Sequence, residues 1–406
     1  MEQLPSRNTF YRADSWLTMK NDVAKYLLIA ASTLFACVVA SMLVVAIVDP
    51  YGVSGAPRLQ GFNERKTRLA NQLVAVKFAR LQSVQPRTVV IGSSRIDRGF
   101  DPMGASWPDS ARPVFNLGIP AAPLSDRLPY FQRLLEASPA TETVIFGLDY
   151  LDYLEEFVLL KETRRVSAQT PLVNQLTPYF GWRALLDAVR TPFEQRRESY
   201  YRMTANGFSA GHALNIEIQR FGHGAYVRRM LAEHTHSLRQ ILAPVPAREL
   251  CCPTHYRVVL QQIVDTAVMH DVNLILIALP YHAEYLEAFD DVGLMEYADQ
   301  WHRDLLAVAR QARADNSGRS SLVWSFFNYS SMSSEPIPEL NATEDRMENF
   351  YDPGYFTPRF GDRMVAEIFG QAFGERYGTV IDTETVEKTI EEFHDGRLMY
   401  LRQKIE

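Results

Sequence analysis

Cysteine is scarce in this chain of 406 residues, and neither charge is in strong excess. Only three cysteines occur, two of them adjacent, so a disulfide framework is excluded and the redox compartment stays open. The net charge of −6, from 42 basic and 48 acidic residues, argues against a nucleic-acid binder, whose affinity rests on a basic surface. No Gly-rich phosphate loop, His-Glu-x-x-His or Cys-x-x-Cys motif occurs. The sequence therefore indicates no cofactor and no metal.

One long segment, residues 26–48, carries no charge, and its 23 residues form a helix long enough to cross a hydrocarbon core of about 30 Å. A buried core helix and a cleaved signal peptide are the alternatives. The segment lacks a polar stripe and exceeds a signal peptide's apolar region. The 15 residues before it contain Arg12, Lys20 and Lys25, whereas the 15 after it contain only Arg58. Because basic residues favour the cytoplasmic side, we expect a single-pass inner-membrane anchor with the main domain in the periplasm or otherwise outside the cytoplasm.

Short apolar runs alternate with helical patterns after this anchor. The predicted strands are residues 88–91, 113–118, 143–147, 273–280 and 321–324. The predicted helices are residues 64–83, 125–136, 255–270, 295–314 and 358–373. Wholly apolar strands separated by helices indicate an α/β fold, a three-layer parallel sheet covered on both faces.

The same patterns predict the domain organisation. We expect a cytoplasmic N-terminus, the anchor, a juxtamembrane linker and helix, a main domain with a helical insertion at about 153–253, and a C-terminal helical tail. The corresponding ranges are 1–25, 26–48, 49–85, 86–374 and 375–406.

Polar residues stand where the predicted strands end, which is where chemistry gathers in parallel sheets. Ser94 and Arg95 follow the first strand on a turn made tight by Gly92; an ordinary strand-to-loop turn is the alternative for this serine. The other strand ends and the C-terminal region contribute Asn116, Gly118, Asp149, Asp352 and Tyr355.

The order of these residues resembles that of the GDSL/SGNH hydrolase superfamily, over residues 86–150 and 270–374. The resemblance implies an SGNH/flavodoxin-like fold in which Ser94 is the nucleophile, Gly118 an oxyanion-hole donor and Asp352 the acid that orients the base. With Gly118, Asn116 and Arg95 are the residues expected to bind the oxyanion or the substrate.

Two positions depart from that pattern. Asp149 stands where the family has an oxyanion-hole asparagine, and an ionised carboxylate cannot donate a hydrogen bond. Tyr355 stands where the family has the catalytic histidine, and a phenol is a poor base at neutral pH. His282 follows the predicted strand 273–280 and is the histidine that could replace it. A histidine that caps the next helix is the alternative.

The layout also resembles membrane-anchored SGNH-like proteins of cell-surface polymer acylation, including the lipoteichoic-acid D-alanylation anchor protein and alginate-type O-acetylation proteins. That resemblance implies three partners: the lipid bilayer, a membrane-bound O-acyltransferase and a surface polysaccharide. Two functions follow as expectations. The first is an acyltransferase or esterase in which Ser94 handles acyl esters on an exported polysaccharide. The second is a catalytically degenerate protein that binds the polysaccharide or the acyltransferase.

Overall fold

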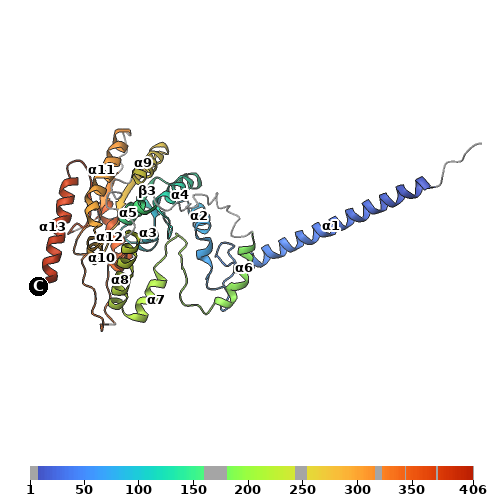
Figure 1. Cartoon of the computed structure of the whole chain (residues 1–406), viewed down its shortest axis with the longest axis horizontal. Helices are drawn as coiled ribbons and strands as arrows, with labels where there is room; N and C mark the ends of the chain where they lie inside the picture. Colours follow the sequence, from blue (N-terminus) through green and yellow to red (C-terminus); the bar gives the residue numbers. More distant parts are fainter. Residues whose placement is uncertain are drawn as a thin grey trace, which may run out of the picture. The chain divides into compact units, whose positions relative to one another are not determined.

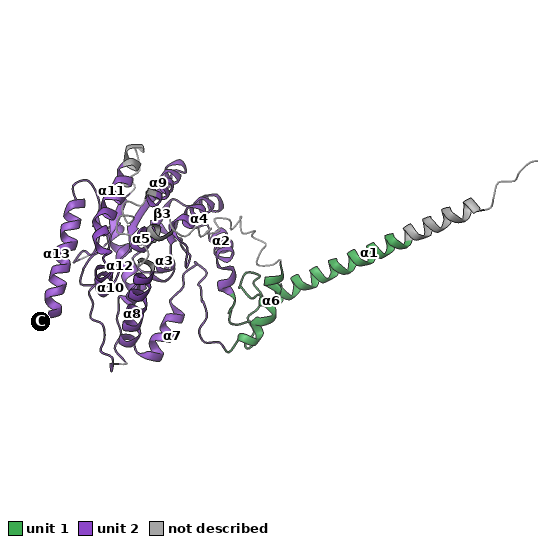
Figure 2. Cartoon of the chain, in the orientation of Figure 1, with its two compact units in different colours: residues 1–68, 176–196 green, residues 69–175, 197–406 purple. Residues whose placement is uncertain are grey.

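The computed structural model describes residues 8–159, 181–242, 254–315, 322–342, 344–371 and 374–405. Contacts divide the chain into two compact units (Figure 2). Unit 1 takes residues 1–68 and 176–196, and unit 2 takes residues 69–175 and 197–406.

Unit 1 is built on the N-terminal helix α1, Asn8–Val48 (Figure 1). Its segment Asp22–Val48 is largely exposed and contains an 18-residue window with a mean hydropathy of 2.5, so it is long and apolar enough to span a membrane. The unit also contains α6, Trp182–Arg190, and the 3-10 helix η3, Thr191–Glu194.

Unit 2 contains a six-stranded sheet in the order β2-β1-β3-β4-β5-β8. The strands are β1 Thr88–Gly92, β2 Val114–Gly118, β3 Thr143–Leu148, β4 Asn273–Ala278, β5 Leu322–Ser325 and β8 Thr379–Val380. The first five pair in parallel, and β8 pairs antiparallel with β5 at the edge. A separate hairpin joins β6, Phe350–Asp352, to β7, Tyr355–Phe356. The mostly parallel α/β sheet predicted from the sequence is thus confirmed.

Helices cover both faces of this sheet. The helices of unit 2 are α2 Leu73–Val84, α3 Ser94–Gly99, α4 Leu124–Ala137, α5 Tyr150–Leu159, α7 His212–Phe221, α8 His223–Leu242, α9 Thr254–Met269, α10 Ala283–Asp291, α11 Ala298–Asp315, α12 Pro358–Ile368 and α13 Val386–Ile405. Short 3-10 helices are η1 Leu69–Gln72, η2 Asp109–Ala111 and η5 Met295–Tyr297.

Alternate residues of each strand enter different cores. In β1, Val89 and Ile91 belong to the core packed with α2, α4, α9 and α11, whereas Val90 belongs to the core packed with α3 and α12. A strand buried on both faces has no polar side, which explains the uninterrupted apolar runs in the sequence.

The segment predicted as an insertion, residues 153–253, lies partly outside the described residues. Its described part contains the end of α5 and α6, η3, α7 and α8, and no strand.

Candidate functional site

A cleft of about 510 Å³ opens at the carboxyl edge of the sheet, where β1 lies beside β3. The strand order reverses at this point, because the chain passes from β1 outward to β2 and then returns to β3 on the other side. Ligand sites in open α/β sheets form at such switch points. Residues lining the cleft include Ser94, Arg95, Asp126, Asp149, His234 and Tyr355.

Ser94 is the first residue of α3 and is half-buried in this cleft. Ser93 caps the helix, since its hydroxyl accepts a hydrogen bond from the Arg95 N–H at 3.2 Å. The Ser94 Oγ lies 2.9 Å from the Tyr355 hydroxyl, at hydrogen-bonding distance. The structure therefore brings together the predicted nucleophile and the tyrosine at the position of the family's catalytic histidine.

Asp352 shapes the turn that presents Tyr355. Its Oδ1 accepts hydrogen bonds from the backbone N–H groups of Gly354, at 2.8 Å, and Tyr355, at 2.9 Å. Burial raises the pKa of Asp352, and His234 is the first of the groups that act in the opposite direction. This carboxyl thus holds the β6–β7 turn through backbone contacts.

Arg98 places a positive charge beside the serine–tyrosine pair. Its guanidinium lies over the Tyr355 ring, with 4.3 Å between Cζ and the ring centroid. Burial acts to lower the pKa of Arg98, but interactions with Tyr355 and two carboxylates outweigh it, and the net pKa is raised. A cation therefore lies against the ring of Tyr355.

Arg95 and Asp149 form a buried ion pair next to the cleft. The Arg95 Nη1 donates to Asp149 Oδ1 at 2.7 Å, its Nε donates to the Gly354 carbonyl at 2.6 Å, and its Nη2 donates to the Pro280 carbonyl. The guanidinium also stacks on the Tyr281 ring, 3.8 Å from the centroid. One side chain thereby ties the end of β3 to the segments after β4 and β6.

Asp149 is held as a carboxylate by two arginines. Besides Arg95, Arg127 lies 3.4 Å from its Oδ2 and also pairs with Asp152 at 2.6 Å. Burial alone would raise the pKa of Asp149, but the two arginines and hydrogen bonds lower it overall. At this position the carboxylate is an internal counter-ion, in agreement with its inability to donate a hydrogen bond.

The structure places Gly118, the predicted oxyanion donor, at the end of β2. The Gly118 N–H donates to the Asn116 Oδ1 at 2.9 Å, so it is occupied inside the fold. The Asn116 amide in turn donates to the carbonyls of Ile96, at 2.8 Å, and Phe100, at 2.7 Å. Asn116 is fully buried and links α3 to β2 through these hydrogen bonds. Its side chain therefore has a structural role here, whereas the sequence predicts substrate binding.

The structure places His282, the predicted replacement base, at the start of α10. His282 caps α10, because its Nδ1 accepts from the Glu284 N–H at 3.2 Å. Its Nε2 lies 2.8 Å from the Glu335 carbonyl, so both ring nitrogens are bound to backbone. Burial lowers the pKa of this imidazole, and it is not among the residues lining the Ser94 cleft. The helix-capping alternative describes this histidine.

His234, on α8, is a cleft residue that the sequence reasoning missed. Its ring stacks on Tyr285 with 5.1 Å between centroids, and its Nδ1 is buried without a hydrogen-bond partner within the described part of the chain. Asp126, in the first turn of α4, was missed as well; burial raises the pKa of its half-buried carboxyl, against the opposing charge of Arg127. No strand precedes His234, so a rule based on strand ends does not find it.

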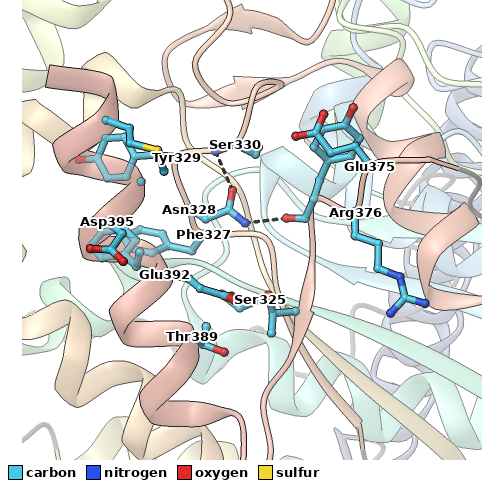
Figure 3. Close-up of a pocket in the computed structure, with 15 residues that line it drawn as sticks. Ser325, Phe327, Asn328, Tyr329, Ser330, Glu375, Arg376, Thr389, Glu392 and Asp395 are labelled. Atoms are coloured by element: carbon cyan, nitrogen blue, oxygen red, sulfur yellow. Dashed lines mark hydrogen bonds between the residues drawn. The ribbon is translucent and has the colours of Figure 1, made fainter. Parts of the chain in front are cut away.

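A second cavity, of about 340 Å³, lies between α13 and the segment after β5. Figure 3 shows Asn328 bridging its wall: the side chain accepts from the Ser330 N–H at 3.2 Å and donates to the Tyr377 carbonyl at 2.6 Å. Among the described residues, no cluster of three or more His, Cys, Asp or Glu residues could hold a metal ion.

Comparison with family models, curated proteins and solved structures finds no match to this chain. Its functional assignment therefore rests on the geometry of the cleft.

Proposed function

We propose that the protein is a membrane-anchored, SGNH-like α/β protein whose cleft binds a polyhydroxylated ligand, such as a segment of a cell-surface polysaccharide, without performing chemistry on it. The observation that carries the proposal is the pairing of the Ser94 hydroxyl with the Tyr355 hydroxyl at 2.9 Å. A serine nucleophile needs a hydrogen-bonded base, and a phenol is a poor one at neutral pH.

The surroundings of Ser94 support the same conclusion. Acyl transfer requires hydrogen-bond donors aimed at the developing oxyanion. The Gly118 N–H is bonded to Asn116, and Arg95 is engaged by Asp149 and two carbonyls. Neither predicted donor is therefore free to serve a reaction.

The cleft instead offers groups that suit sugar hydroxyls. Ser94 and Tyr355 present hydroxyls, and Asp126 presents a carboxyl that accepts hydrogen bonds when ionised. The buried rings of Tyr281 and Tyr285 form an aromatic wall of the cleft behind Arg95 and His234. A concave site with a few polar groups on an aromatic wall is typical of small-ligand recognition.

The membrane anchor indicates on which side of the membrane the cleft lies. Helix α1 spans an inner membrane, the short N-terminus lies in the cytoplasm, and the cleft-bearing unit lies outside it, as the basic residues before the span favour. There the protein meets a polysaccharide and a membrane-bound O-acyltransferase, the partners implied by the family resemblance. It presents the polymer to that enzyme.

Binding to a glycan array of bacterial surface oligosaccharides tests the proposal directly. We expect the full chain to bind a subset of glycans, and Asp126→Asn to weaken binding about tenfold through loss of a charged hydrogen-bond acceptor. Asp109→Asn, at an exposed carboxylate of η2, is the matched control and should bind like the wild type. If both variants bind alike, or the wild type binds no glycan, the cleft is not a glycan site.

A second function, serine acyl transfer, is favoured by one observation: the unpartnered Nδ1 of His234 in the Ser94 cleft. In that reaction the Ser94 Oγ would attack the carbonyl of an acyl ester or thioester and pass its proton to His234, and the donor's alcohol or thiol would leave with that proton. The acyl group would then move to a sugar hydroxyl or to water, whose proton would return through His234 to the Ser94 Oγ.

A further inference from the structure

Helix α6 in unit 1 has an apolar face that nothing in the described chain covers. Trp182 is 71% exposed and Val189 is 52% exposed, and the same side continues to Phe193 of η3, which is 84% exposed. Leu186 lies between them at helical spacing and is half-buried. We name these four residues the α6 stripe. Exposed apolar surface of this size and continuity marks an interaction site.

The opposite face of α6 is fixed against the end of α1. Ala184 and Ala188 are buried, as are Val45 and Val48 in the last two turns of α1, and the two helices are in contact within unit 1 (Figure 2). The Tyr51 hydroxyl, just after α1, donates to the Asp187 carboxylate at 2.9 Å. The α6 stripe therefore has a fixed position relative to the anchor.

The length of α1 places this contact at the membrane surface. The 27 residues of Asp22–Val48 extend about 40 Å, roughly 10 Å more than a hydrocarbon core. The exposed surface of α1 ends at its last two turns, where Val45 and Val48 are buried, so the part of α1 against which α6 packs lies at the end of the span, next to the headgroup region. Helix α6 then lies at the depth where tryptophan side chains are enriched.

Exposed arginines flank the α6 stripe. Arg183 and Arg190 lie beside it on the helix, and both are exposed. Apolar side chains bordered by cations match a bilayer interface, because the apolar groups enter the acyl boundary while guanidinium groups bind lipid phosphates.

We propose that α6 and η3 form an interfacial membrane attachment, in which the α6 stripe inserts into the outer leaflet of the bilayer that α1 spans. The occupant is lipid. This inference rests on the anchoring part of the proposed function and not on the chemistry of the cleft. Its consequence is a second contact with the membrane, which restricts rotation of unit 1 about the α1 axis.

Site-directed spin labelling of the full chain in nanodiscs of phosphatidylcholine with phosphatidylglycerol tests this attachment. The background carries Cys37→Ser, Cys251→Ser and Cys252→Ser. Single labels are placed by Val189→Cys and Phe193→Cys in the α6 stripe. Leu43→Cys, on an exposed side of α1, is the lipid reference, and Glu391→Cys, on an exposed side of α13, is the aqueous reference.

The measured quantity is the collision rate of each spin label with oxygen divided by its collision rate with a water-soluble nickel chelate. We expect this ratio to be at least about five times higher at Val189→Cys and Phe193→Cys than at Glu391→Cys. The ratio at both stripe positions should approach that at Leu43→Cys. Aqueous values at the stripe with a lipid value at Leu43→Cys overturn the attachment and leave the anchor intact. An aqueous value at Leu43→Cys overturns both. Stripe labels shielded from both reagents in native membranes show that a protein covers the α6 stripe, and also overturn the proposal.

Discussion

Asp149 and Gly118 occupy positions where an acyl-transfer enzyme of the resembled family would place oxyanion donors, and both are committed to internal contacts. Asp149 neutralises Arg95 and Arg127, and the Gly118 N–H is bonded to Asn116. Buried charges and buried N–H groups need such partners, because leaving them unpaired costs several kcal/mol. Their role is therefore to hold the ends of the strands together around the cleft.

His302 provides a prediction at the residue scale. Its Nε2 lies 3.1 Å from the Ser325 Oγ, and its Nδ1 lies 2.9 Å from the Ala298 carbonyl. Burial lowers the pKa of His302 to about 4. Unfolded histidine titrates near pH 6.5, so the unfolded chain binds a proton between these pH values and the folded chain does not. The stability due to neutral His302 is complete above about pH 6.5 and is lost as the pH falls towards 4, an effect of about 3 kcal/mol.

His302→Gln should remove this part of the pH dependence. We expect the free energy of unfolding, measured in denaturant at several pH values, to fall less steeply from pH 6.5 to 4 in the variant than in the wild type. His255→Gln, at an exposed histidine of α9, is the matched control and should have the wild-type slope. If the free energy of unfolding changes equally with pH in His302→Gln and in the wild type, His302 has the same pKa in the folded and unfolded chain, which contradicts this prediction.

At the scale of elements, the cleft depends on close packing between α3 and α12. A Cβ atom added at Gly361 of α12 would collide with the Gly99 carbonyl oxygen at the end of α3. Gly361→Ala should therefore displace the helix that carries Ser94 and reduce the free energy of unfolding by about 2–3 kcal/mol, measured in denaturant. Gly354→Ala is the control, since the nearest atom to its added Cβ is at 3.6 Å, an ordinary contact. A stable Gly361→Ala variant would contradict this packing.

The main strands and helices were predictable because burial leaves a strong pattern. Predicted strands at residues 88–91 and 143–147 appear as β1 and β3, and the helix predicted at 255–270 appears as α9, within one residue at each end. The β6–β7 hairpin and β8 escaped prediction, since segments of two or three residues show no periodicity.

The candidate site was predictable only in part. Strand ends indicated Ser94, and motif order indicated Tyr355, and the structure pairs them. His234 comes from a helix of the insertion, where a polar residue has the same pattern as any solvated side chain. The role of His282 depended on which backbone groups surround its ring, which sequence spacing does not specify.

At the scale of the whole molecule, the apolar exposed surfaces and the cleft belong to different units. Unit 1 contains α1 and the α6 stripe, both apolar and exposed, and unit 2 contains the cleft. The sequence of residues 182–190 has the pattern of an amphipathic helix. Its packing against α1, about 140 residues away in the chain, is visible only in the structure.

The central claim, that the cleft binds without chemistry, is tested most directly by reaction of the full chain with a fluorophosphonate probe. Activated serines form a stable covalent adduct with such probes, whereas an unactivated hydroxyl does not. The account predicts equal labelling of the wild type and Ser94→Ala, both at background level. Labelling of the wild type that Ser94→Ala abolishes would contradict it. If His234→Ala also cut the labelling rate about 10²–10⁴-fold, serine acyl transfer with His234 as the base would replace the binding function.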